Sequence, residues 1–181
     1  QWFSQMGYTG IAEHTSHYDA VLPPMAFQAG LGEVGRNGYL ITPTLGSRVR
    51  LCAVLTDMPL VIDDPLDMGV EEFCRYCMKC ADTCPSNSIP QGDMTVYHGV
   101  EKWKLEAETC SEYWNVVGTD CAICMAICPF SKPNTLMHSV VRWFVKHSKL
   151  APRLFPIFDD ILYGTKWKAK PVSPWLEYKQ G

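Results

Sequence analysis

The chain has 181 residues, of which 47% are hydrophobic and 19% charged, so it can bury a core and is not a disordered tail. Its 16 Lys and Arg residues against 19 Asp and Glu residues leave a net charge of −3, and with no basic run this argues against a nucleic-acid partner. The apolar stretches are short and broken by Asp, Pro or Lys, so no segment is expected to span a bilayer. Because the chain begins with Gln and shows no signal peptide, we expect a fragment or a processed form.

The first part of the chain is predicted to hold one short helix followed by two strands. The helix covers LPPMAFQAG, with a proline in its first turn and Gly30 at its end. RNG at 36–38 marks a turn, and strands are predicted over Tyr39–Thr42 and Arg48–Leu55, joined through PTLGS. Residues 57–72 form an acidic loop that contains proline.

The second part is predicted to be helical outside its cysteine motifs. A helix is expected in VEKWKLEAE (100–108), and the segment NTLMHSVVRWFVKHS predicts an amphipathic helix capped by Asn134 or Thr135. APRLFPIFDDILYG (151–164) predicts a last short helix, and the tail KAKPVSPWLEYKQG (168–181) is expected to be extended. The apolar face of the amphipathic helix consists of Leu136, Val140, Val141, Phe144 and Val145.

Gly30, Gly32 and Gly35 have the G-x-G-x-x-G spacing of a dinucleotide-binding loop. That fingerprint requires a strand before the glycines and a helix that opens at them. Here the predicted helix comes first and a turn and a strand follow, so nucleotide binding is disfavoured. Two interpretations stay open: the glycines form a helix end and a tight turn, or they let the backbone approach a flat ligand closely.

Eight of the nine cysteines follow a pattern typical of [4Fe–4S] clusters. CRYCMKCADTCP (74–85) has the C-x2-C-x2-C-x3-C-P spacing of bacterial ferredoxins, and CAICMAICP (121–129) repeats its last part with Cys110 upstream. In two-cluster ferredoxins the last cysteine of such a run ligates the other cluster. The spacing therefore predicts a first cluster on Cys74, Cys77, Cys80 and Cys128 and a second cluster on Cys84, Cys110, Cys121 and Cys124.

Other uses of the cysteines fit this spacing less well. Structural zinc sites use paired C-x2-C units, not a triple run that ends in C-P. A disulfide framework would require an oxidising compartment and a small loop-rich domain. Cys52 lies in the predicted strand Arg48–Leu55, so we expect it to be a buried small hydrophobic residue rather than a ligand.

Three long segments together resemble the corrinoid- and iron–sulfur-dependent reductive dehalogenases: AGLGEVGRNGYLITPTLGSRVRLCAVLTDMPL, the two cysteine motifs, and HSVVRWFVKHSKLAPRLFPIFDDILYG. Epoxyqueuosine reductase shares the glycine-rich segment and the paired motifs, but its equivalent of VGRNG tends to carry Lys, and residues 134–178 favour the dehalogenase. The resemblance implies an α+β fold. It would consist of the C-terminal part of a nitroreductase-like cobalamin-binding core, followed by a bacterial-ferredoxin-like domain with two [4Fe–4S] clusters.

The resemblance implies three domains and one activity. Residues 1–60 would complete the cobalamin-binding core, residues 61–133 would form the ferredoxin-like domain, and residues 134–181 would supply C-terminal helices and an extended tail packed on the core. The activity would be removal of a halogen from organohalides, such as chlorinated ethenes or aromatics, by a cobalamin reduced through the two clusters. The alternatives are a ferredoxin-like electron-transfer module and an epoxyqueuosine reductase-type enzyme.

The resemblance also implies residues around the corrinoid. The family's proton-donating tyrosine is expected upstream of this chain, and Tyr8, Tyr18 and Tyr39 do not match its position. A basic residue before the first cluster is expected near the halide; Arg50 fits best as this catalytic residue, and Arg48 is its rival. The residues expected along the corrin are Gly30, Gly32, Gly35, Tyr39 and Thr42.

The implied partners are an organohalide substrate, an electron donor of a membrane respiratory chain, and a small membrane anchor protein. The implied location is peripheral, on the outer, periplasmic face of the cytoplasmic membrane, with the export signal upstream of this chain.

The remaining conspicuous residues are given structural roles. We expect Asp159 and Asp160 to be solvated, and Trp143, Phe144 and Phe158 to pack in the core. The histidines expected at the surface or in the core, rather than on a metal, are His98, His138 and His147.

Overall fold

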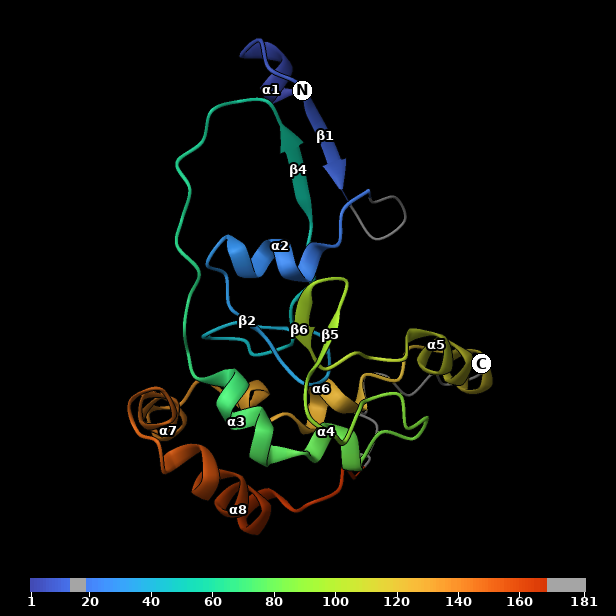
Figure 1. Cartoon of the computed structure of the whole chain (residues 1–181), viewed down its shortest axis with the longest axis vertical. Coiled ribbons are helices and arrows are strands. Elements are labelled where there is room, and N and C mark those ends of the chain that lie inside the picture. The colour runs from blue at the N-terminus through green and yellow to red at the C-terminus, as the bar shows by residue number, and fades with distance from the viewer. Residues whose placement is uncertain (14–18, 169–181) are drawn as a thin grey trace, which may run out of the picture.

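The computed structural model describes residues 1–13 and 19–168, and it mixes short strands with helices (Figure 1). A two-stranded ribbon projects at one end, and the connection 57–69 runs back along the molecule to the helices that carry the cysteines (Figure 1). Within the described ranges, every helix is too short or too polar to traverse a lipid bilayer. The helices are α1 (Trp2–Gln5), α2 (Leu22–Gln28), α3 (Val70–Cys77), α4 (Lys79–Asp82), α5 (Ala107–Val117), α6 (Ile123–Ile127), the 3-10 turn η1 (Pro129–Ser131), α7 (Leu136–His147) and α8 (Ala151–Tyr163).

The strands of the described residues form three antiparallel ribbons of two strands each: β1 with β4, β2 with β3, and β5 with β6. The predicted strands Tyr39–Thr42 and Arg48–Leu55 are each confirmed in part, as β3 and β4, but they pair with other strands and not with each other. The predicted helix before the glycines is confirmed as α2, which has proline in its first turn, and Gly30 beyond its end is left-handed with φ 67°. The strands are β1 (Gly10–Glu13), β2 (Glu33–Val34), β3 (Leu40–Ile41), β4 (Ala53–Thr56), β5 (Thr95–Tyr97) and β6 (Val100–Lys102).

The expectation for Cys52 is wrong. Its side chain is exposed, and it lies just before β4. The ribbon of β1 and β4 buries little: Ile11 and Val54 are 48% and 47% exposed. Alternation of apolar residues predicts the strand, but a two-stranded ribbon has no second layer to cover the faces that the alternation defines.

The helix predicted over 100–108 is also wrong in its first half. Val100–Lys102 is β6, which pairs with β5, and α5 begins only at Ala107. The two residues of the turn, His98 and Gly99, both have positive φ, at 50° and 79°. Two left-handed residues match the twist of a tight hairpin. The turn therefore favours a strand after it, although the sequence that follows has a helical pattern.

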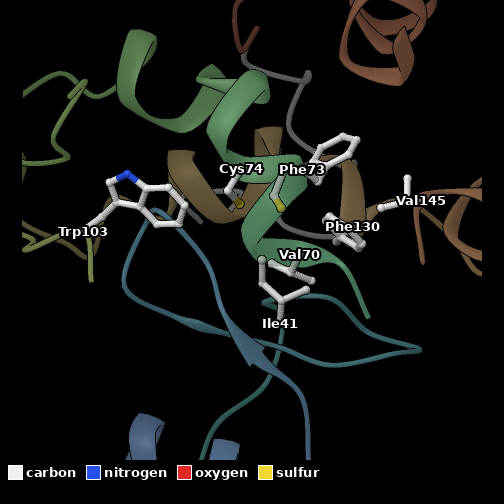
Figure 2. Packing of buried hydrophobic residues seen from close by; sticks show 8 residues of the cluster. Ile41, Val70, Phe73, Cys74, Trp103, Phe130 and Val145 are labelled. Carbon is white, nitrogen blue, oxygen red and sulfur yellow. The ribbon is translucent and has the colours of Figure 1, made fainter. Parts of the chain in front are cut away.

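The hydrophobic core lies around α3 and includes two of the cysteines (Figure 2). Phe73 of α3 packs edge-on against Phe130 of η1, with ring centroids 5.1 Å apart. Val70, on the same helix, is fully buried. Residues far apart in the sequence meet here, so the core joins the glycine segment, both cysteine motifs and α7. The buried members are Ile41, Val70, Phe73, Cys74, Trp103, Cys128, Phe130 and Val145.

The two C-terminal helices are confirmed as α7 and α8, but their apolar face is only partly used. Val145 is buried, whereas Trp143, Phe144 and Phe158 are 56%, 44% and 54% exposed, so the expectation that these aromatics pack in the core is wrong for this chain. The N-cap of α7 is Thr135, as predicted, although its hydroxyl contacts His138 Nδ1 at 2.7 Å rather than a backbone N–H. The tail 169–181 lies outside the described residues.

A buried ion pair fixes α8 on the cysteine-bearing helices. Lys79 of α4 is 3% exposed, and its ammonium contacts Asp159, lies 3.0 Å from Asp160 and donates to the carbonyl of Gly164 at 3.1 Å. The expectation that both aspartates are solvated is therefore wrong. The two carboxylates raise the pKa of Lys79 against the effect of its burial.

Asp159→Asn should lower the free energy of unfolding by roughly 2 kcal/mol, because it removes the more buried carboxylate while Asp160 still faces Lys79. Urea denaturation of the metal-free chain measures the change. Glu71→Gln, which breaks the exposed pair with Arg75, is the matched control and should cost less than about 1 kcal/mol. Equal losses for the two variants would mean that the buried pair adds nothing.

Candidate metal centre

Four cysteines line one cavity between α3, α4 and η1. Cys74 and Cys77 lie on α3, Cys80 lies on α4, and Cys128 follows α6 about fifty residues further along the chain. The cavity is otherwise lined mainly by apolar side chains, together with Arg36, Asn37 and Lys79. The structure thus brings together the four residues predicted to hold the first cluster.

Burial dominates the chemistry of this first set. Cys74 is buried, which raises the pKa of its thiol to about 12, and the neighbouring Cys128 adds to the rise. Burial also raises the pKa of Cys77, Cys80 and Cys128. A metal-free cavity therefore keeps these thiols protonated, and a bound cation would have to release their protons, as thiolate metal sites do.

The other four cysteines form a second, less buried set. Burial raises the pKa of Cys124 to about 12, and the other charges that raise it are those of Cys84, Cys110 and Cys121. The pKa of Cys110 is raised by burial and then by Cys84 and Cys121. Cys110 and Cys124 thus each lie within electrostatic reach of the other three members of the set, in the grouping that the spacing predicts. Cys80 of the first set is affected by Cys124, so the two sets are neighbours.

Cys84 is the member of the second set best prepared to be a thiolate. Burial raises the pKa of this thiol, but hydrogen bonds from the Ser86 hydroxyl and from the backbone N–H groups of Ser88, Ser86 and Ile89 outweigh burial and lower it. The Ser86 Oγ lies 3.5 Å from the sulfur. Backbone N–H groups turned toward a sulfur stabilise its negative charge, which is the environment expected of a cluster ligand.

The two motifs share a backbone feature. Met78 follows Cys77 and Ala122 follows Cys121, and both are left-handed, with φ 53° and 50°. They are two of the four non-glycine residues with positive φ among the described residues. Such strain concentrates at functional sites, and here each of the two residues is the N-cap of the short helix that follows it, α4 after Met78 and α6 after Ala122. This conformation could not be predicted from the residue types, because neither Met nor Ala favours it.

The described residues contain no group of three His, Cys, Asp or Glu side chains that could hold one metal ion. A cubane differs from such a site, because its four cysteines surround a cluster of several irons. The assignment of four cysteines to each cluster stays a prediction.

The glycine segment holds α3 at both ends. At its N-terminal end, the Glu33 carboxylate accepts hydrogen bonds from the N–H groups of Met68 and Val70, at 2.6 and 3.1 Å. At the C-terminal end, Arg36 donates to the carbonyl of Cys74 at 3.1 Å. These two charged residues, which the sequence reasoning missed, connect the segment before the motifs to the motif helix itself.

The glycines of this segment pack against the chain's own backbone. A Cβ on Gly32 would lie 2.2 Å from the carbonyl oxygen of Ile41, and one on Gly35 would lie 2.6 Å from the Ile41 side chain. A Cβ on Gly30 would lie 2.5 Å from the carbonyl oxygen of Asp64. Close approach within the protein is thus sufficient to require glycine at the three positions, and their corrinoid contact stays a prediction.

The other residues expected at the corrinoid are spread out. Tyr39 lies beside the second cysteine set: burial, then Cys124 and Cys110, raise its pKa to about 12. Thr42 bonds to Gly46 in a tight turn. Arg50 is exposed between β3 and β4, and the exposed Arg48 donates to the carbonyl of Leu45 at 3.3 Å. The structure does not gather these residues around one cavity, and Tyr18 lies outside the described residues.

Comparison with known proteins finds a family model that matches the cysteine region. Residues 73–132 match the family model of a 4Fe–4S dicluster domain. The chain is 39% identical over 174 residues to the tetrachloroethene reductive dehalogenase of Sulfurospirillum multivorans, covering 92% of this chain and 34% of that protein. It is 29% identical over 128 residues to the epoxyqueuosine reductase of Cyclobacterium marinum, covering 60% of this chain and 37% of that protein.

Solved structures agree with these similarities. A catabolic reductive dehalogenase in complex with 3-bromo-4-hydroxybenzoic acid has a TM-score of 0.82 and 32% identity, covering 90% of this chain and 24% of its own length. A reductive dehalogenase structure described as suggesting a mechanism for B12-dependent dehalogenation has a TM-score of 0.81, with the same identity and coverage. The chain thus spans between about a quarter and a third of the length of these proteins.

Cys84→Ala should remove the cluster of Cys110, Cys121 and Cys124 and spare the cluster of Cys74, although Cys84 belongs to the first motif by sequence. Iron analysis and EPR of the reconstituted variant measure this, with about half of the iron retained. Cys128→Ala is the reciprocal control. Loss of the first cluster alone in Cys84→Ala would refute the crossed assignment.

Proposed function

Because this chain is a homologue of the reductive dehalogenases, related to epoxyqueuosine reductase and with a 4Fe–4S dicluster domain, we propose that it carries two [4Fe–4S] clusters that serve reductive removal of a halogen from an organohalide. The observation that carries the proposal is the sorting of eight cysteines into two neighbouring sets of four. When bound, each cluster accepts and donates one electron at a time.

The residues of this chain hold and insulate the first site. Cys74, Cys77, Cys80 and Cys128 would supply thiolates inside a cavity with a largely apolar lining, to which the packed rings of Phe73 and Phe130 contribute. Low local polarity and hydrogen bonds to sulfur are the protein's means of setting a cluster potential.

The second site is better placed to receive electrons. Its four cysteines are all half-buried, whereas two cysteines of the first set are buried in the core. Cys80 and Cys124 lie within electrostatic reach of each other, so the two sites are adjacent. We therefore propose that an external donor reduces the second site, which passes electrons inward to the first.

Cobalamin is proposed as the further cofactor from the B12-dependent dehalogenation described for one similar structure. Tetrachloroethene and a brominated hydroxybenzoate, found with relatives, indicate organohalides as the substrate class. In the described residues Gly32 and Gly35 pack closely against Ile41. A contact with a corrin is therefore not needed to explain these glycines, and no step at a corrin is assigned to them. Arg50, exposed and close in sequence to the first motif, is the residue proposed to face the halide.

The proposal extends to organisation and location. Residues 1–60 would belong with the cobalamin-binding core of nitroreductase-like fold, 61–133 with the ferredoxin-like domain, and 134–181 with the C-terminal helices. The electron donor would be a component of a membrane respiratory chain, reached through a small anchor protein at the outer face of the cytoplasmic membrane.

One observation favours a second function, a plain electron-transfer module. The glycine segment, which sets this chain apart from a small ferredoxin, is fully engaged by its own backbone and by α3. A protein of that kind would carry both clusters and would neither bind cobalamin nor release halide.

Anaerobic reconstitution should give about eight irons and eight sulfides per chain, because the eight paired cysteines satisfy two cubanes. Iron and sulfide analysis measures this, and a count near four would contradict the proposal.

The catalytic part of the proposal is tested by halide release from tetrachloroethene, with reduced viologen as donor and cobalamin present, in a chimera that joins this chain to the remaining two thirds of the Sulfurospirillum multivorans enzyme. Release should depend on both clusters and should be lost in Cys80→Ala. A protein with full iron content that oxidises viologen but releases no halide, with tetrachloroethene or with 3-bromo-4-hydroxybenzoate, would be the electron-transfer module.

A further inference from the structure

Arg36 is a buried cation without a carboxylate partner. Arg36 is only 2% exposed, and none of the ion pairs within the described part of the chain includes it. Its guanidinium donates to the carbonyls of Cys74, Pro90 and Gly92, at 3.1, 2.7 and 2.8 Å. Its Cζ also lies 4.5 Å from the centre of the Trp103 ring.

Carbonyls and a ring face solvate a guanidinium but do not neutralise its charge. A buried charge is costly unless an opposite charge lies near it. Arg36 lines the cavity of the first cysteine set, and the charges that favour its protonated form are those of Cys80, Cys74, Asp93 and Cys77, in that order. Three of these four are cysteines of one set, and Asp93 is exposed to solvent.

The other cation of this cavity differs in one respect. Lys79 lies beside Cys80 but is already paired with Asp159 and Asp160, so its charge is more than balanced locally. In the second set, the charges that affect Cys110 and Cys124 are those of other cysteines. Arg36 is therefore the cation at the first site whose charge no carboxylate pairs, and no cation is among the main charges that affect Cys110 and Cys124.

We propose that Arg36 is the counter-cation of the first cluster and raises its reduction potential above that of the second cluster. This rests on the proposed function, since it requires both clusters to be present. Four thiolates make an oxidised cluster an anion, and reduction adds a further negative charge. A fixed positive charge in a poorly polar cavity stabilises the reduced form more than the oxidised form.

The consequence is a direction for electrons. The first cluster, buried next to the glycine segment, holds an electron more tightly than the second, more exposed cluster. An electron that enters at the second site would therefore be favoured to move inward to the first site. The same guanidinium fixes the backbone of Cys74, Pro90 and Gly92, which keeps its charge at a constant distance from the sulfurs.

The test is an anaerobic, EPR-monitored redox titration of the cluster-loaded protein, with the second cluster as internal reference. Arg36→Met and Arg36→Gln remove the charge; Gln keeps a donor for one carbonyl. At a fixed potential, each should lower the ratio of reduced to oxidised first cluster by at least about tenfold, the scale of one charge at an effective dielectric constant near 20. Arg36→Lys should stay near the wild type.

Arg75→Met is the matched control. Arg75 follows Cys74 directly, but it is exposed and paired with Glu71 and Glu72, so its loss should leave both potentials unchanged. Equal shifts in Arg75→Met and Arg36→Met would overturn the proposal, and so would no shift in the neutral variants of Arg36.

Iron content separates the remaining outcomes. Loading of the first cluster in Arg36→Lys but not in the neutral variants would show that the charge itself is required, which supports the proposal. Failure of Arg36→Lys as well would show that only the guanidinium geometry matters, which overturns it. A wild-type protein with fewer than about eight irons would refute the proposed function instead.

Discussion

The convergence of four cysteines, two of them buried, on one largely apolar cavity is the constraint on which the rest of this structure depends. Cys74 and Cys128 belong to the same buried cluster as Phe73, Phe130 and Val70, so the hydrophobic core and the candidate metal centre are one region (Figure 2). Burial raises the pKa of both thiols, and metal binding requires thiolates. Folding of the core and loading of the first cluster are therefore coupled in free energy.

The two cationic side chains beside this core, Lys79 and Arg36, each have specific partners. Lys79 meets two carboxylates from α8, and Arg36 meets three carbonyls and an indole ring. The first contact makes the C-terminal helix part of the site. The second makes the glycine segment part of it, so elements from both ends of the chain converge on α3 and α4.

The glycine segment shows how a familiar spacing can serve a different purpose. Gly32 and Gly35 pack closely against Ile41. Glu33 and Arg36, beside them, form hydrogen bonds with the two ends of α3. The small residues bring the backbone close enough for the charged residues between them to reach the motif helix. The segment thus holds the cysteine-bearing helix α3 in place through hydrogen bonds within the chain.

The sequence by itself determined the features that depend on neighbours in the chain. Cysteine spacing predicted the two sets of four, because the C-x-x-C steps are local turns; the positions of proline and glycine located α2, and periodicity located α7. Only the tertiary structure decided which charges are buried. Lys79 and Asp159 are 80 residues apart, and Arg36 is 38 residues from Cys74 and 56 from Gly92, so no local pattern indicates these contacts. Exposure was likewise beyond the sequence: Cys52 and Trp143 have apolar surroundings in the chain, yet no second layer covers them here, because burial depends on what packs against an element and not on its own composition.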